Sequence, residues 1–356
     1  MNMVETAIEL PYLACKNRVI RSAVHSFLGS TDGYMTEAEY GMYEELAKNN
    51  IGLLITGHCA VSPKGRANPE QINIFADEYI PQFTKAAEIA HKYDAKFVVQ
   101  ISHAGPRAVD NDDLADVVPC EMKKNRHARA LTLEEIAAIE RAFVAAAFRA
   151  KNAGVDGVQL HAAHSYLLSR FIDKTFNQRT DEYGGTIENR FRICENIIRG
   201  IKEECGQDFP VLIKINNDSK TDDGEYEGDM IYMLRRCKEL GVSLVECSGV
   251  DFLSMPRNAT LYYLDRVTKL RRAVDIPLSL VGGVRSLADM EKVLAAGIDM
   301  VSLGRALVTE PDFVTKVLAG QEKSRCVSCN RCFVLPHLHA GIRCVFNRKK
   351  VMKKAE

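Results

Sequence analysis

The sequence has 356 residues, enough for one large α/β domain or two medium ones with a sizeable core. It carries 47 Lys and Arg residues against 47 Asp and Glu residues, and this balance argues against electrostatic binding to nucleic acid or to a membrane surface. No apolar run is long enough to span a membrane and the N-terminus does not resemble a signal peptide, so we expect a cytoplasmic protein. The expected partners are a small-molecule substrate and, in a homo-oligomer, further copies of the chain.

Strand-like apolar segments alternate with amphipathic helical segments from the start of the chain. In its first half we expect strands at 17–24, 52–61, 95–103 and 155–163, and helices at 36–50, 78–94 and 131–154. Thr36 with Glu39, and Thr132 with Glu135, predict capping boxes at the start of two of these helices. The polar stretch 104–130 lacks periodicity and predicts an extended loop over one end of the fold.

The same alternation continues in the second half of the chain. Strands are expected at 210–216, 243–249, 277–283 and 300–306, and helices at 188–206, 229–241, 263–274, 286–297 and 312–320. Apolar strands joined by helical crossovers form parallel sheets, and eight β/α units close most economically as a barrel. The fold class predicted is therefore α/β, a (β/α)8 TIM barrel. A doubly wound open sheet is the alternative, but no Gly-x-Gly-x-x-Gly follows any strand.

Polar residues and glycines follow the predicted strands at the positions where barrels carry their chemistry. The strand 155–163 leads into His161, His164 and Tyr166. The last two strands end in glycine turns, Gly282-Gly283 and Gly304-Arg305. In barrels the loops after these two strands often bind phosphate through backbone N–H groups, and an arginine adds a fixed charge. The sequence therefore predicts a phosphate site beside a polar barrel mouth.

A series of motifs in fixed order then carries a family resemblance. These motifs are NRVIRSA, GLLITGHCAVSPKGR, QISHAG, HAAHSYLL, RTDEYGGTIENR, VGGVRS and SLGRAL. From about Leu10 to Gly320 the chain resembles the Old Yellow Enzyme family, the NADH:flavin oxidoreductases. Within that family it is similar to the FMN domain of bacterial 2,4-dienoyl-CoA reductases. The resemblance implies an ene-reductase that passes hydride from NAD(P)H through FMN to an activated C=C bond of an α,β-unsaturated carbonyl or acyl compound.

The resemblance also assigns residues to the cofactor. The FMN phosphate would lie at Gly283, Gly304 and Arg305. Lys214 would lie beside N1 and O2 of the ring, where a cation stabilises the anionic reduced flavin. His25 occupies a position beside the flavin at which many members carry Cys or Thr. The remaining contacts with the ring would come from Ser22, Ala23, Gly57 and Gln100.

The catalytic residues that the resemblance implies are His161, His164 and Tyr166. The two histidines would hold an activating oxygen of the substrate, and Tyr166 would donate a proton to its α carbon. The dienoyl-CoA branch carries a further histidine in the loop after the sixth strand. Here that loop reads SGVDFLSMPRN, which argues against a dienoyl-CoA substrate. The loops 104–130 and 216–228 are expected to shape the substrate pocket.

Four cysteines gather near the end of the chain: Cys326, Cys329, Cys332 and Cys344. The dienoyl-CoA branch holds a [4Fe–4S] cluster with a similar set, but with three residues rather than two between the second and third cysteines. Zinc and unliganded thiols are the alternatives, and His337 or His339 could replace a ligand. We expect an FMN-binding barrel over 1–320 and a C-terminal cysteine-cluster segment over 321–356.

Two alternative functions stay open at this point. Related barrel-plus-cluster proteins oxidise amines and pass electrons out through an iron–sulfur centre, which here would need a separate electron partner. The absence of Trp makes an aromatic cage for an amine less favourable. The second alternative is a zinc-pinned, flavin-binding partner subunit without catalytic activity.

Overall fold

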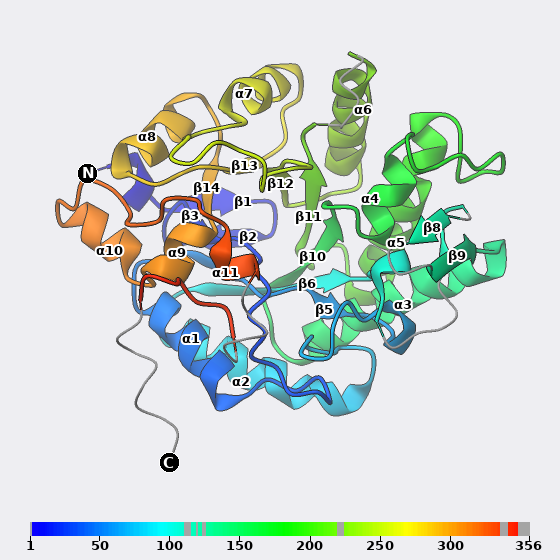
Figure 1. Ribbon diagram of the computed structural model, residues 1–356, viewed down its shortest axis with the longest axis horizontal. Coiled ribbons are helices and arrows are strands. Elements are labelled where there is room, and N and C mark those ends of the chain that lie inside the picture. The colour runs from blue at the N-terminus through cyan, green and yellow to red at the C-terminus, as the bar shows by residue number, and fades with distance from the viewer. Residues whose placement is uncertain are drawn as a thin grey trace.

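The computed structural model describes residues 2–109, 115–118, 120–122, 126–218, 224–334 and 341–347. Eight parallel strands form a closed ring, because β14 pairs with β3 and β6 pairs with β10 (Figure 1). These strands are β3 (Val19–Arg21), β4 (Leu53–Ile55), β6 (Lys96–Ser102), β10 (Gly157–Ala162), β11 (Val211–Asn216), β12 (Leu244–Ser248), β13 (Leu278–Val281) and β14 (Met300–Leu303). The predicted (β/α)8 barrel is confirmed.

Helices follow the strands along the chain and surround the ring (Figure 1). They are α1 (Glu37–Ala47), α2 (Ile80–His91), α3 (Leu133–Asn152), α4 (Leu167–Ile172), α5 (Ile187–Cys205), α6 (Glu225–Glu239), α7 (Leu264–Ala273), α8 (Leu287–Ala295), α9 (Arg305–Thr309), α10 (Phe313–Leu318) and α11 (Arg331–Val334). Short 3-10 turns lie at Met3–Glu5, Pro63–Gly65, Asp77–Tyr79 and Gly105–Arg107. The large apolar core fills the layer between this helical shell and the strands.

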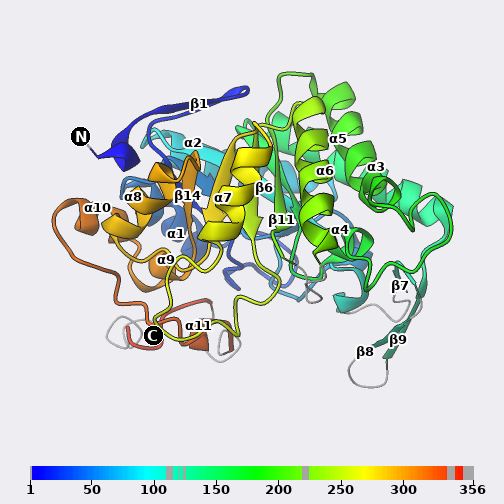
Figure 2. The same ribbon diagram turned by 90° about the horizontal axis from the view of Figure 1, so that it is seen from above.

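Two small sheets lie outside the ring, at opposite ends of the barrel (Figure 2). The hairpin of β1 (Ile8–Leu10) and β2 (Leu13–Cys15) closes the N-terminal end. At the other end, β7 (Ala115–Asp116), β8 (Cys120–Met122) and β9 (Arg126–Ala130) form a 3-stranded sheet. The extended loop predicted for 104–130 is therefore wrong in part, because this segment pairs with itself. Its short strands and mixed composition leave no periodicity to detect.

The two predicted capping boxes have different outcomes, depending on whether the glutamate has other hydrogen-bond partners. The capping box at Thr132 and Glu135 is present, with both reciprocal hydrogen bonds. The one at Thr36 is wrong, since Glu39 is buried and accepts hydrogen bonds from Ser26 at 2.9 Å and Tyr43 at 3.0 Å. Two hydroxyl donors already satisfy this buried carboxylate, so it does not bind the backbone N–H at the helix N-terminus.

The single strand predicted over 52–61 is broken in two. β4 ends at Ile55, and β5 (Cys59–Ala60) pairs with β6 further along. Between them three residues, Thr56 to His58, stand opposite two residues of β6, Val99 and Gln100, so the strand carries one extra residue, a bulge. This break directs the His58 side chain to the barrel mouth, where it becomes important below.

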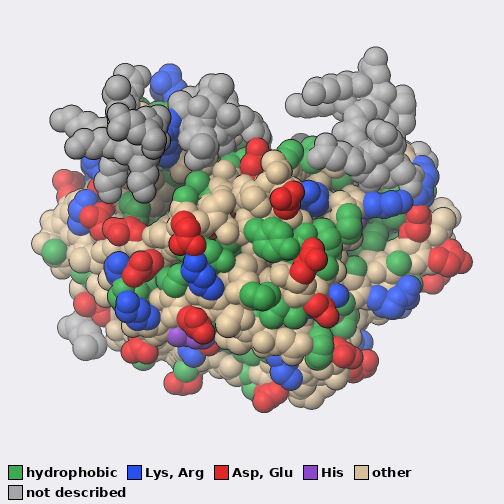
Figure 3. Space-filling model, turned by 90° about the horizontal axis from the view of Figure 1, so that it is seen from below, with side chains coloured by type: hydrophobic (Ala, Val, Ile, Leu, Met, Phe, Trp, Pro, Cys, Tyr) green, Lys and Arg blue, Asp and Glu red, His purple; other side chains and the backbone are tan. Residues whose placement is uncertain are grey.

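Acidic and basic side chains are interspersed over the face of the molecule shown in Figure 3. Among the residues that the structure describes, none of the helices has the length and apolar character needed to cross a membrane.

Candidate active site

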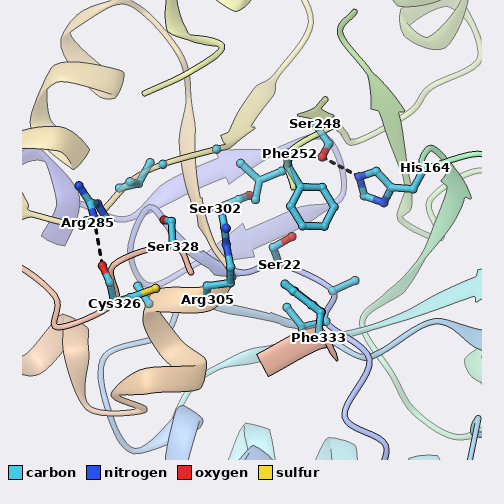
Figure 4. A pocket seen from close by; sticks show the side chains of 18 of the residues that line it. Ser22, His164, Ser248, Phe252, Arg285, Ser302, Arg305, Cys326, Ser328 and Phe333 are labelled. Carbon is cyan, nitrogen blue, oxygen red and sulfur yellow. Dashed lines mark hydrogen bonds between the residues drawn. The ribbon is translucent and has the colours of Figure 1, made fainter. Parts of the chain in front are cut away.

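A cavity opens at the C-terminal ends of the barrel strands (Figure 4). Phe252, from the loop after β12, lies in it between His164 and Arg305, with its ring centroid 5.6 Å from that of His164. A concave site at this end of a barrel is typical of cofactor and substrate binding. Of the predicted site residues, the following line it: Ser22, Ala23, His164, Lys214, Gly283, Gly304, Arg305 and Cys326.

One end of the cavity is bounded by two arginines and a glycine turn. Arg305 and Arg285 both line it, and the Nε–H of Arg285 is buried without a partner among the described residues. Gly283 has a φ of 75°, and a Cβ there would stand 2.7 Å from the Leu261 nitrogen, so the turn requires glycine. Two fixed cations and a close backbone suit a phosphate group. Arg285 is missing from the predicted set, although it follows Gly283 closely in the chain.

His161, His164 and Tyr166 come together at the mouth. After β10 the chain turns through His164 and Ser165, which have φ values of 60° and 59°. Such left-handed residues other than glycine cost about 1–3 kcal/mol each and cluster at functional sites. The ring centroid of His161 lies 5.3 Å from that of His164 and 4.7 Å from that of Tyr166. The strained turn thus gathers the three side chains that the sequence singled out.

Burial sets the protonation state of these groups. It lowers the pKa of His164 to about 3 and the pKa of His161 well below its ordinary value, and nearby Lys214 and Arg107 act in the same direction. It also raises the pKa of the Tyr166 hydroxyl to about 12. At neutral pH both imidazoles are therefore uncharged and the phenol keeps its proton. Each imidazole then has one N–H donor and one acceptor.

The two imidazoles differ in their hydrogen bonding. His164 Nε2 lies 2.8 Å from the Ser248 hydroxyl oxygen. The Nδ1 atom of His161 is buried and has no partner among the described residues. Unpaired buried polar atoms are rare in native proteins. His161 is therefore suited to a polar atom of a bound ligand.

Lys214 belongs to a chain of buried polar side chains inside the barrel. Its Nζ donates to the Ser22 hydroxyl at 2.8 Å and lies 3.3 Å from Glu246 Oε2. Glu246 also accepts from Gln159 at 3.0 Å, and Gln159 accepts from Gln100 at 2.7 Å. Burial lowers the pKa of Lys214, and the charge of Glu246 opposes that shift. Glu246 is missing from the predicted set, although a glutamate inside the apolar strand SLVECSG is a detectable signal.

Three predicted cofactor residues lie outside the lining of this cavity. Gln100 belongs to the chain of polar side chains just described. Gly57 immediately precedes His58 in the break between β4 and β5. His25 lies with its ring centroid 4.8 Å from that of His58. Gly57 and His25 therefore lie on the His58 side of the mouth, and Gln100 lies within the chain of buried polar side chains.

His58 contacts the predicted proton donor directly. Its Nε2 lies 3.2 Å from the Tyr166 hydroxyl oxygen, and the side chain is 9 % exposed. It is missing from the predicted set because 52–61 has the apolar pattern of one continuous strand. The signal that could have found it is a histidine directly after glycine within such a strand.

The four C-terminal cysteines line one small cavity, next to the first. Cys326 and Arg305 line both cavities, so the cysteines lie beside the proposed phosphate end. No group of three or more His, Cys, Asp or Glu side chains in the described part of the chain is arranged to hold a single metal ion. His337 and His339 lie outside the described residues.

The residues at the mouth fit the FMN that the sequence implies. The unpaired Arg285 Nε–H and the turn that requires glycine at Gly283 suit its phosphate. Lys214 provides a buried cation on the adjoining cavity wall, where a ring that gains negative charge would need one.

Comparison with known proteins agrees with this fit. The family model of the NADH:flavin oxidoreductase / NADH oxidase family matches residues 7–324. The chain is 32% identical over 334 residues to an NADH oxidase of Thermoanaerobacter brockii, covering 89% of this chain and 51% of that protein. It is 31% identical over 312 residues to an NADPH dehydrogenase of Bacillus subtilis (strain 168), covering 86% and 92%.

Among solved structures, an old yellow enzyme homologue from Zymomonas mobilis superposes with a TM-score of 0.79 at 21% identity, covering 92% of this chain and 95% of that one. The chain spans about half the length of the Thermoanaerobacter relative and nearly all of the Bacillus relative. The family match covers the whole barrel, including both glycine turns and the His161 to Tyr166 segment. The chain belongs to the NADH:flavin oxidoreductase / NADH oxidase family, the Old Yellow Enzyme type of FMN-dependent oxidoreductase that its motifs resemble.

Proposed function

We propose that the protein is an ene-reductase, which reduces an activated C=C bond of an α,β-unsaturated carbonyl or acyl compound. The observation that carries the proposal is the cluster of two uncharged imidazoles and a protonated phenol at the barrel mouth. An unpaired Nδ1 on His161 suits an oxygen-bearing substrate. A cluster without a carboxylate suits a neutral carbonyl better than a cationic amine.

Each residue has a role that follows from its chemistry. His161 and His164 bind the activating oxygen and stabilise the negative charge that develops on it. Tyr166 donates its proton to the α carbon, and a weak acid suffices there because the acceptor is an incipient carbanion. When bound, FMN would supply the hydride. Arg285 and Arg305 would hold its phosphate, and Lys214 would provide a cation beside its ring.

An anaerobic spectral titration tests this proposal. The purified protein should show flavin absorbance that bleaches with NADPH or NADH and returns when an enone is added. Absence of flavin, or a reduced flavin that no enone reoxidises, would contradict the proposal. Bleaching by an amine in place of the nicotinamide would instead favour the amine-oxidising alternative.

We propose in addition that Cys326, Cys329, Cys332 and Cys344 bind a metal centre. Their shared cavity supports it. We favour a [4Fe–4S] cluster over zinc because the spacing of the four cysteines in the sequence resembles the cluster-binding set of the dienoyl-CoA branch.

Metal analysis of anaerobically purified protein separates the possibilities for the cysteines. Iron with acid-labile sulfide is the expected result, and a separate electron-donor or acceptor partner then becomes relevant. Zinc would instead indicate a structural site that fixes the C-terminal segment. The variant Cys329→Ser should lose the metal, whereas Cys247→Ser, a buried cysteine of β12, should retain it.

A further inference from the structure

His58 links two parts of the molecule that are distant in sequence. Its Nε2 lies 3.2 Å from the Tyr166 hydroxyl oxygen. Its Nδ1 lies 2.7 Å from Gln71 Nε2 on the opposite side of the ring. A histidine held at both nitrogens has a defined tautomer, provided that one of the partners can only donate or only accept.

Gln71 is such a partner, because its own contacts fix the orientation of its amide. The backbone N–H of Ala67 donates to Gln71 Oε1 at 2.6 Å, which identifies that atom as the oxygen. Gln71 Nε2 donates to the His58 carbonyl oxygen at 3.1 Å, which identifies the nitrogen. The amide nitrogen has hydrogens and no acceptor capacity, so His58 Nδ1 must accept. In the neutral ring the proton is then on Nε2, the atom that faces Tyr166.

We propose that His58 is a positioning residue for Tyr166: its Nε2–H donates to the phenol oxygen and directs the phenol's own hydrogen towards the substrate. The same N–H then stabilises the phenolate that remains after Tyr166 has given its proton to the substrate carbon. The inference deepens the proposed function, because it rests on the proton-donor role of Tyr166. In this step the phenol O–H bond breaks, a C–H bond forms, and the electron pair stays on the phenolate oxygen.

The surroundings exclude a proton relay through the ring. Burial lowers the pKa of His58 well below its ordinary value, with smaller contributions in the same direction from His25 and His164. The ring is therefore neutral, and its second nitrogen faces an amide that cannot pass a proton. Other charged or titratable groups near the phenol are His161 and Arg107. His58 therefore acts by holding and stabilising the phenol, and the phenolate regains its proton from solvent.

The first test measures the acidity of the phenol without any turnover. A fluorinated tyrosine that ionises near neutral pH is incorporated at position 166, and its phenolate absorbance is titrated in the FMN-bound protein. His58→Asn should raise this pKa by about one to two units, because a hydrogen bond to a charged group is lost. His58→Gln should keep the pKa of the phenol close to that of the parent, because the glutamine amide nitrogen reaches the position of the imidazole Nε2. The surface variant His91→Asn serves as control and should titrate like the parent.

The second test uses single turnovers of the holoenzyme. His58→Asn should slow reoxidation of the reduced flavin by an enone about tenfold to hundredfold, with His58→Gln close to the parent. If His58→Asn titrates like the parent, or if His58→Gln shifts the pKa as much as His58→Asn, the inference is overturned. A protein that reduces no enone but shows the predicted pKa shift would refute the ene-reductase function and leave the His58–Tyr166 contact intact.

A variant that keeps His58 controls for misfolding caused by the loss of the histidine. Gln71→Glu places an acceptor at Nδ1, which moves the ring proton there and leaves Nε2 to accept from the phenol. The expected result is the same direction of pKa shift as in His58→Asn. An unchanged pKa would overturn the tautomer assignment, whereas a lowered pKa would show a protonated ring that donates to the phenol through Nε2 and would support the contact.

Discussion

The two halves of the barrel interior are built from the same strands and have opposite chemistry. Towards the N-terminal end the interior is apolar, and the hairpin of β1 and β2 seals it. Further along the same strands, on the same face, the side chains become polar. The paired positions are Ile20 and Ser22, Val98 and Gln100, Leu212 and Lys214, and Leu244 and Glu246. Because side chains alternate along a strand, a step of two residues stays on one face.

This difference shows where the barrel gains stability and where it gains function. Burying apolar side chains stabilises the fold by about 1.5–3 kcal/mol each. Burying the Lys214–Glu246 pair adds little, because desolvation offsets most of the attraction between the charges. The apolar half therefore holds the barrel together, and the polar half is retained for what binds at the mouth.

The largest expected effect comes from the polar half and concerns activity alone. Tyr166→Phe should slow the transfer from reduced flavin to an enone about 10²- to 10⁴-fold, because the proton donor is lost. Reduction of the flavin by NADPH should change little, as measured by stopped-flow absorbance. Tyr232→Phe, at a tyrosine of α6 that donates to Glu195, is the matched control. An equal loss in both half-reactions would reject the assigned role.

Removing one charge of the buried pair should affect both stability and the cofactor. Lys214→Met leaves Glu246 without its counter-ion and should lower the free energy of unfolding by about 3–5 kcal/mol. The double variant Lys214→Met/Glu246→Leu should recover most of that loss in urea unfolding of the apoprotein. Its flavin potential should still be lower than that of the parent, because the cation remains absent. Recovery of both properties would show that Lys214 has only a structural role.

A variant in the apolar half should show the reverse pattern. Leu212→Ala, two residues before Lys214, removes a fully buried side chain and should cost about 2–5 kcal/mol in urea unfolding. The potential and absorbance of the flavin bound per folded molecule should match the parent. A shifted flavin potential would mean that the two halves are coupled rather than separate.

The smallest effect is a pH dependence of stability. His164 has a pKa of about 3 in the folded protein against about 6.5 when unfolded, so the unfolded state binds the proton first as the pH falls. Stability is then unaffected above the unfolded pKa and is lost below it, by about 2 kcal/mol for one such group at pH 5. In urea unfolding, the free energy of unfolding of His164→Asn should fall correspondingly less between pH 7 and pH 5 than that of the parent. Identical losses would show that His164 is accessible to protons in the folded state.

The amino-acid pattern was enough to predict the barrel and the residues at the centre of its mouth. The period of each apolar segment predicts whether it is a strand or a helix. Buried parallel strands that alternate with helices then form a sheet that closes into a barrel. His161, His164, Lys214 and Arg305 could be found because each lies at or just beyond a strand end, a place fixed by local pattern. Tyr166 follows within the same turn.

The residues that contact this centre from distant parts of the chain became visible in the three-dimensional structure alone. Tyr166 faces His58, 108 positions away, and Lys214 faces Ser22, 192 positions away. Such contacts depend on strand register and on ring closure, which no local period encodes. The break between β4 and β5 has the same origin, because the register of their pairing with β6 leaves one extra residue between Ile55 and Cys59, a bulge that contains His58. The sequence thus located the reacting groups, and packing across the ring set the hydrogen bonds that hold and tune them.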